Sequence, residues 1–93
     1  DIYRNIDSKI LLKKIFVLTK KNGYLINNLD STIYAEKPIM APYIPKMRSI
    51  IAKILETDVQ LINIKATRGE KIGFVGREEG IACEAVVMLK KYI

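Results

Sequence analysis

The three prolines of this 93-residue chain, Pro38, Pro42 and Pro45, fall within one short segment and constrain the fold more than any other feature. Proline has no backbone N–H to donate, so neither a strand interior nor a helix interior can run through such a segment. The segment must therefore separate two regular elements. We expect an extended segment before it, a loop across it, and a helix that begins as the prolines end.

The twelve letters before this loop, YLINNLDSTIYA, read as a strand. Leu25, Leu29, Ile33 and Ala35 share one parity, which is the two-residue period of a strand with one buried face. The β-branched residues become denser toward the end, as strands prefer. We predict a strand over Leu25–Ala35 with a bend at the Asn27–Asn28 pair.

Two stretches have helical periodicity. Asp7 can cap a helix over Ser8–Lys21, and Gly23 lies just past its end. Its predicted buried face contains Ile10, Leu11, Ile15 and Leu18, widened by Leu12, Phe16 and Val17. A second helix extends through Glu56, and its apolar face of Ile44, Met47, Ile51, Ile54 and Leu55 is expected to pack in the core.

The segment QLINIKA follows the second helix and reads as a short strand. A strand, a helix and a strand in this order predict a right-handed crossover between parallel strands. The segment IACEAVVMLKKYI fits either a helix or a strand, and we favour a central strand buried on both faces, with Cys83 as a small buried hydrophobe. The expected fold is α+β, an α/β sandwich in which a mixed sheet with a βαβ crossover packs on helices. Residues 1–93 are expected to form a single domain.

Charge and composition exclude several function classes. The net charge of +6 suits an anionic partner, but the lysines are scattered, so solubility is favoured over nucleic-acid binding. No apolar run approaches the ~18 residues of a membrane span. The single cysteine cannot form an internal disulfide, which fits a reducing compartment. The 93 residues contain no histidine, so they supply neither an imidazole general base nor an imidazole metal ligand.

The stretch KATRGEKIGFVGREEG contains four of the five glycines and follows a predicted strand end. Glycines let backbone N–H groups approach an anion closely. Thr67 offers a hydroxyl, Arg68 a guanidinium, and Glu70 a carboxylate for a divalent cation. The spacing matches neither a Walker A loop nor a G-x-G-x-x-G turn. From these residues alone, a phosphate site and a mobile surface loop are equally supported.

Two motif blocks carry a resemblance to a known family. KATRGEKIGFVGREEGIACEA resembles the signature K-A-T-T-T-E-K-L-G-F-T-G-R-G-E-G-I-A of the 2-C-methyl-D-erythritol 2,4-cyclodiphosphate synthases. NLDSTIYAEKPIMAPYIPKMR resembles the family's V-D-x-T-I-x-A-x-x-P-K-x-x-P-x-I-x-x-M-R, and NGYLINNLD fits the G-Y-x-x-x-N-x-D before it. The blocks come in the family's order, and the agreement spans residues 7 to 91.

The resemblance implies an enzyme of non-mevalonate isoprenoid biosynthesis, a homotrimer with active sites between subunits. Such an enzyme converts 4-diphosphocytidyl-2-C-methyl-D-erythritol 2-phosphate into the cyclic diphosphate and releases CMP. Neither nucleic acid nor a membrane is an expected partner. The expected location is a bacterial cytoplasm or a plastid stroma of the apicoplast type.

The resemblance also assigns residues. The cytidine-nucleotide site is expected to contain Ala35, Pro38, Ile39, Met40, Ala41, Ala66, Thr67 and Arg68. Thr67 and Glu70 match catalytic positions, and Glu70 matches the ligand of magnesium or manganese. Phe74, Arg77 and Glu79 match the lining of a cavity on the threefold axis, where some members hold an isoprenoid diphosphate.

Three positions depart from the family's usual form. Arg68 and Gly69 replace two threonines, so a hydroxyl is lost and a guanidinium gained near the phosphates. Glu78 replaces a glycine and adds negative charge, which disfavours a diphosphate in the central cavity. An ordinary surface cluster of salt bridges is an equally supported reading of Arg77, Glu78 and Glu79. Tyr34 and Tyr43 are expected to be packing residues.

The family's zinc site uses an aspartate and two histidines from an N-terminal part that matches nothing here. We therefore expect zinc ligands outside this sequence and a chain that is the C-terminal portion of a longer enzyme. A start without methionine agrees with a partial chain, and the 93 residues alone are expected to be inactive. Two alternatives remain: a basic nucleotide- or RNA-binding module, and a structural oligomerisation domain without a ligand.

Overall fold

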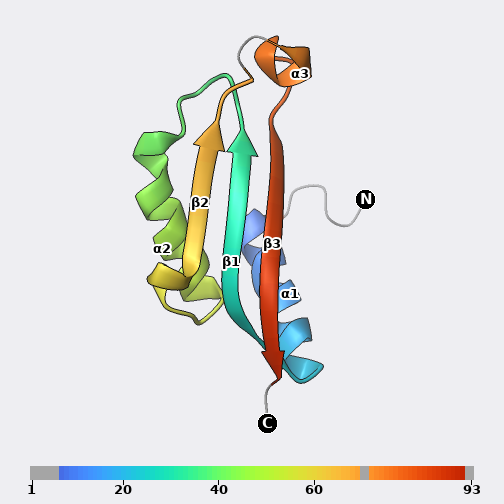
Figure 1. The fold of residues 1–93 in the computed structure, drawn as a ribbon. Helices are drawn as coiled ribbons and strands as arrows, with labels where there is room; N and C mark the ends of the chain where they lie inside the picture. Colours follow the sequence, from blue (N-terminus) through green and yellow to red (C-terminus); the bar gives the residue numbers. More distant parts are fainter. Residues whose placement is uncertain (1–6, 70–71, 92–93) are drawn as a thin grey trace.

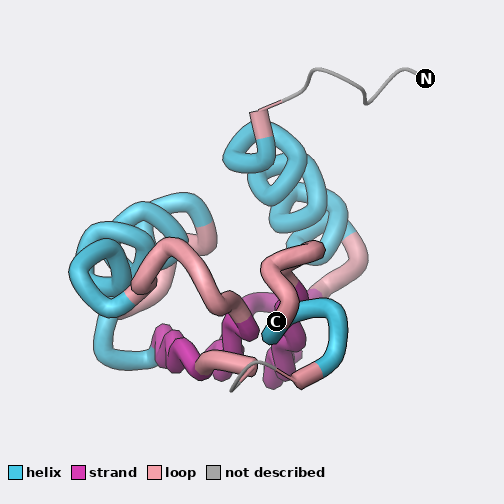
Figure 2. Tube along the Cα trace, turned by 90° about the horizontal axis from the view of Figure 1, so that it is seen from above, coloured by secondary structure: helices cyan, strands magenta, loops and turns pink. Residues whose placement is uncertain are grey.

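Helices cover one face of a three-stranded sheet (Figure 1). A computed structural model describes residues 7–69 and 72–91. Viewed along the strands, α1 and α2 both lie on the same side of the sheet (Figure 2). The elements, in chain order, are α1 (Ser8–Lys21), β1 (Tyr24–Tyr34), η1 (Ala41–Tyr43), α2 (Ile44–Ile54), η2 (Val59–Leu61), β2 (Ile62–Thr67), α3 (Gly73–Gly76) and β3 (Ala82–Lys91).

The sheet has the strand order β2-β1-β3 and is mixed. β1 runs parallel to β2 and antiparallel to β3, and α2 lies in the connection between the two parallel strands. This confirms the predicted α+β fold and its crossover. A register shift between Ile26 and Asn28 bulges β1 at the predicted bend.

The first helix has the limits that the sequence predicts, because both of its ends are marked. The Asp7 carboxylate accepts a hydrogen bond from the backbone N–H of Lys9 at 2.8 Å. Gly23 lies past the other end with φ of +90°, a conformation that glycine adopts without steric cost. Local sequence therefore decides where this helix begins and ends.

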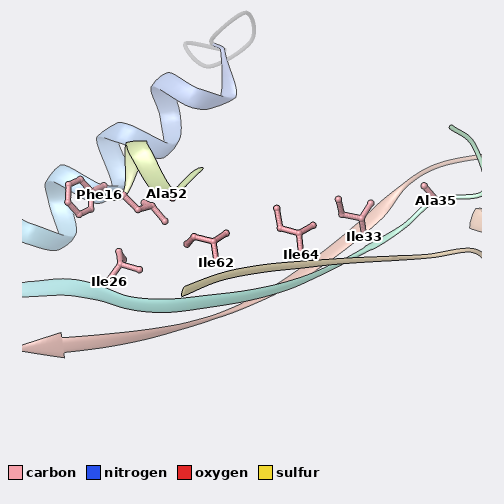
Figure 3. Close-up of a cluster of buried hydrophobic side chains, with 8 residues drawn as sticks. Phe16, Ile26, Ile33, Ala35, Ala52, Ile62 and Ile64 are labelled. Atoms are coloured by element: carbon pink, nitrogen blue, oxygen red, sulfur yellow. The ribbon is translucent and has the colours of Figure 1, made fainter. Parts of the chain in front are cut away.

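The core lies between the two helices and the covered face of the sheet (Figure 3). Ile62 of β2 is fully buried, and Phe16 of α1 is nearly so. From α2, Met47 and Ile51 are partly buried against this cluster, as the second helix's apolar face predicts. The row of buried side chains continues along the sheet to Ala35, just beyond the end of β1.

The buried face of α1 is not the predicted one. Phe16 is buried and Leu12 packs against the core, whereas Ile10, Leu11, Ile15 and Leu18, together with Val17, are exposed. Apolar residues surround most of this helix, so periodicity alone does not select which side meets the sheet. The large Phe16 ring fills the space above β1 and β2, and this packing sets the rotation of the helix.

The last strand exists as predicted, but it is not central. β3 pairs with β1 at one edge of the sheet, and Val86 is 70% exposed. Cys83 is also exposed and not a buried hydrophobe. β3 has apolar side chains on both of its faces, and burying them would need neighbours on both sides of the strand. Among the described residues, α1 partly covers one face, and the other has no cover.

Candidate functional site

The carboxyl ends of β1 and β2 meet at one edge of the sheet (Figure 1). Tyr34 is in register with Thr67, and the backbone N–H of Ala35 donates to the Thr67 carbonyl at 3.0 Å. The two segments that leave the strands are therefore adjacent, although about thirty positions separate them in sequence. Ligands of α/β folds bind at such strand ends.

A small hollow lies between these two segments. Its volume is about 180 Å³, and it is lined by Ala35, Ile39, Met40, Ala41, Ala66, Thr67 and Arg68. Seven of the eight residues predicted to bind cytidine thus come together, and Pro38 is the one that does not line the hollow. The predicted juxtaposition of the two segments is confirmed, whereas nucleotide binding itself stays a prediction.

The loop that forms one wall of the hollow is shaped by its prolines. It ends in η1, where the Tyr43 N–H donates to the Met40 carbonyl at 2.9 Å and Pro42 occupies an early helical position that needs no donor. Met40 packs against the core, whereas Ile39 is exposed. This wall therefore rests on Met40, and the Ile39 side chain can vary without disturbing it.

Glu36 is part of this region, and our sequence interpretation did not include it. Its carboxylate accepts a hydrogen bond from Arg68 Nε at 2.9 Å, and its side chain is only 6% exposed. A buried carboxylate requires such a partner. The sequence did not reveal this pair, because the pairing register of β1 and β2 brings an acid just past one strand end beside a base just past the other.

A second hollow lies on the other side of Arg68. Its volume is about 600 Å³, and it is lined by Glu36, Lys37, Arg68, Gly76, Arg77 and Glu78. Lys37 and Glu78 form an exposed ion pair across it at 3.4 Å. Arg68 thus borders both hollows, with 56% of its side chain exposed.

The loop after β2 turns back through two positions that depart from the family's usual form. A Cβ at Gly69 would lie 2.6 Å from the backbone nitrogen of Gly76, so this close approach requires glycine. Glu78 has φ of +62°, a left-handed conformation that costs a non-glycine residue about 1–2 kcal/mol. Glycine at that position of the family signature fits the same backbone without strain.

The three residues expected at a central cavity lie together beside α3. Arg77 and Glu79 form an exposed ion pair at 2.9 Å, and the Glu79 N–H donates to the Phe74 carbonyl at 2.8 Å. The Phe74 ring is half exposed. Arg77 and Glu79 thus form a surface salt bridge, and both the cavity lining and the threefold axis stay predictions.

The donor set of the described residues does not fit a zinc site. Among residues 7–69 and 72–91 no group of three or more histidine, cysteine, aspartate or glutamate side chains is arranged to hold a metal. Glu70, the predicted magnesium or manganese ligand, lies outside the described residues.

Neither tyrosine that we expected to pack is buried. The Tyr34 hydroxyl donates a hydrogen bond to Glu84 across β1 and β3, and this carboxylate raises the pKa of that hydroxyl. The Tyr43 ring is more than half exposed.

In the described part of the chain, no helix combines the length and the hydropathy that crossing a bilayer requires.

Comparison with known proteins agrees with the motif resemblance. The model of the YgbB family matches residues 1–90. The chain belongs to this family. It is 52% identical over 91 residues to the 2-C-methyl-D-erythritol 2,4-cyclodiphosphate synthase of Geobacillus sp. (strain WCH70), covering 98% of this chain and 58% of that protein. The synthase of Bacillus cytotoxicus is also 52% identical, over 89 residues, with 96% and 56% covered. The chain thus spans somewhat more than half the length of the curated relatives it matches.

Solved structures agree in fold. The bifunctional IspDF of Campylobacter jejuni superposes with a TM-score of 0.93 at 37% identity, covering 97% of this chain and 24% of that one. The IspF of Plasmodium falciparum, in a complex with CDP, gives a TM-score of 0.87 at 28% identity, covering 94% and 56%. These likenesses confirm the family resemblance and agree with the predicted α+β fold.

Proposed function

We propose that these residues are the C-terminal portion of a 2-C-methyl-D-erythritol 2,4-cyclodiphosphate synthase. The complete enzyme cyclises 4-diphosphocytidyl-2-C-methyl-D-erythritol 2-phosphate and releases CMP. One observation carries the proposal: both motif blocks that resemble the family's signature contribute to the same hollow at the ends of β1 and β2, in a chain that is 52% identical to such a synthase. The 93 residues alone are not expected to catalyse the reaction.

The hollow suits the base of the nucleotide. At about 180 Å³ it is smaller than the ~300 Å³ at which pockets for drug-sized ligands begin, so it accommodates one ring and not a whole substrate. The small side chains of Ala35 and Ala66 leave room for the ring, and the backbone groups of residues 39–41 hydrogen-bond to it. Since backbone groups do the reading, Ile39 and Ala41 can replace the family's usual side chains.

The chemistry needs alignment and charge neutralisation more than a protein base. The 2-phosphate oxygen forms a bond to the β-phosphorus, and the bond from that phosphorus to the CMP oxygen breaks. Thr67 and Arg68, at the mouth of the hollow, donate hydrogen bonds to the diphosphate and hold it in line for this displacement. Glu70 is the proposed ligand of magnesium or manganese, which supplies positive charge to the phosphates when bound. Zinc, with ligands outside this sequence, completes the proposed metal content.

Assembly into a homotrimer is the second part of the proposal. Phe74, Arg77 and Glu79 would face the threefold axis, and the exposed apolar side chains of β3 support the need for a covering neighbour. Glu78 makes an isoprenoid diphosphate a poor ligand for a cavity there. We place the complete enzyme in a bacterial cytoplasm or a plastid stroma. Sedimentation of the complete protein as a monomer at micromolar concentration would contradict the trimer.

Turnover in Glu70→Gln tests the catalytic part. In the complete protein at limiting magnesium, CMP release should fall by about 100-fold or more, the scale of losing one electrostatic contact to a transition state. CMP binding should change little, because the base pocket is separate. Glu56→Gln, an exposed glutamate in the turn after α2, is the matched control and should keep wild-type turnover. Undiminished turnover in Glu70→Gln would refute the role of Glu70.

A basic module that binds RNA is the second candidate, and the net charge of +6 is the observation that keeps it open. Binding through phosphate contacts would weaken steeply as salt rises. Binding through the hollow would be competed by CMP and would depend much less on ionic strength. A titration with labelled RNA at two salt concentrations, with and without CMP, separates the two.

A further inference from the structure

Arg68 and Glu36 form a contact between charged side chains that joins the two segments of the candidate site directly at the ends of β1 and β2. We propose that Glu36 is a positioning residue for Arg68, and that Arg68, held in this way, makes the site select cytidine ligands that carry a diphosphate. The inference rests on the proposed function and adds a specificity determinant to the same site.

The burial of Glu36 shows that the orientation of Arg68 is built into the fold. Among the described residues, Glu36 and Ser31 are the buried polar ones, and Glu36 alone carries a charge. Removing a carboxylate from water is costly unless a positive partner compensates it. Arg68 supplies that partner at 2.9 Å, so displacing the arginine would leave a buried charge with less compensation.

The geometry leaves the rest of the guanidinium available to a ligand. Its Nε donates to Glu36, while 56% of the side chain stays exposed. Arginine has five donors in a rigid planar fork, so fixing one edge also fixes the directions of the others. Because the plane is set by a buried acid, little side-chain entropy is lost when a phosphate binds.

The position of Arg68 determines which part of a ligand it meets. It borders the 180 Å³ hollow proposed for the base and the 600 Å³ hollow that also contains Lys37 and Arg77. A nucleotide with its base in the first hollow would carry its phosphates past Arg68 toward the second. A guanidinium there can hold two phosphate oxygens at once, whereas the threonine of the family's usual form can donate one hydrogen bond.

The test compares ligands that differ only in phosphate number. Isothermal titration calorimetry of the complete protein with cytidine, CMP and CDP gives the preference of the site for each phosphate. Arg68→Ala should reduce the CDP-over-cytidine preference by about 10- to 100-fold, the scale of a charge-assisted bidentate contact. Glu36→Gln keeps the shape of the side chain but releases the guanidinium, so it should reduce the preference by about 10-fold, with cytidine affinity unchanged.

Two further variants make the result specific. Arg68→Lys keeps the charge and loses the fork, so its preference should lie between those of wild type and Arg68→Ala. Lys13→Ala with Glu56→Gln removes an exposed ion pair at the other end of the sheet, 3.3 Å between its charged atoms, and should leave the preference unchanged. If Glu36→Gln does not fold, the CDP-over-cytidine preference of Arg68→Lys, a change at an exposed side chain, decides whether a positioned guanidinium sets the selectivity.

The possible failures are distinguishable. An equal loss of cytidine, CMP and CDP affinity in Glu36→Gln, together with a lower Tm, would reduce the pair to a structural role and overturn the inference. A wild-type preference for CDP that persists in Arg68→Ala and Arg68→Lys would also overturn it, while leaving the proposed function intact. A wild-type protein that binds none of the three ligands would refute both.

Discussion

Two regions of the sandwich differ in how well this chain covers their side chains. One is the pair of adjacent ends of β1 and β2, and the other is the outer surface of β3 and α1. At the strand ends Ala35 and Glu36 are buried, the backbone segments are hydrogen-bonded, and charges are paired. On β3 and the outside of α1, large apolar side chains such as Val86 and Ile10 are exposed. The first region has its partners within the chain, whereas the second has apolar side chains whose partners the described residues do not provide.

The largest expected effect is the difference in unfolding free energy between shortening a buried isoleucine and shortening an exposed one. Ile62→Ala should lower the free energy of unfolding by about 2–5 kcal/mol, because a fully buried side chain leaves a cavity. Ile10→Ala makes the same chemical change at a position that is 53% exposed and should cost under about 0.5 kcal/mol. Chemical denaturation of both variants of the complete protein measures the difference. A cost at Ile10 equal to that at Ile62 would show that another part of the protein covers α1, and the comparison would fail.

Gly69 tests how tightly the site region is closed. Gly69→Ala places a Cβ 2.6 Å from the Gly76 nitrogen, and backbone cannot yield as a side chain can, so we expect a loss of about 1–3 kcal/mol. Gly80→Ala is the matched control, since its Cβ would meet the Phe74 ring at 3.3 Å. The ring can shift, and the cost should be smaller. Equal unfolding free energies for Gly69→Ala and wild type would mean that α3 does not pack on Gly69.

Glu78 offers a stabilising change in the same loop. Glu78→Gly removes left-handed strain at φ of +62° and should raise the free energy of unfolding by up to about 1 kcal/mol, less the exposed ion pair with Lys37. Glu79→Gly, at a residue without positive φ, should instead lower it by roughly 0.5–1 kcal/mol. Thermal melts of the two variants give the signs. Destabilisation by both would exclude strain at Glu78.

The smallest effect concerns the hydrogen bond between Tyr34 of β1 and Glu84 of β3. The Glu84 carboxylate raises the pKa of Tyr34 above its ordinary 10.0, so folding favours the neutral hydroxyl. The stabilisation is therefore fully present below about pH 10 and is lost as pH rises through the folded-state pKa. The stability difference between wild type and Tyr34→Phe, measured from pH 8 to pH 11, should shrink at the alkaline end. A difference independent of pH would show that the hydrogen bond does not contribute.

Local signals in the sequence were sufficient for most of the elements. Asp7 and Gly23 set both ends of α1, and Asn27–Asn28 marked the bulge. The proline-rich segment separated β1 from α2, with Pro45 in the first turn of that helix. These features act within a few residues, where side-chain and backbone chemistry is decisive on its own. The two motif blocks likewise contain the residues that form the walls of the hollow.

Three features were decided only by tertiary structure. Which face of α1 is buried depended on the fit of Phe16 above the sheet, and the edge position of β3 depended on which strand it pairs with. The Glu36–Arg68 contact depended on the parallel register of β1 and β2. Each of these joins residues far apart in the chain, and neither apolar periodicity nor charge encodes the register that brings them together. The sequence by itself therefore determined the elements and the family, whereas packing determined what each surface meets, because burial and pairing are properties of neighbours and not of single residues.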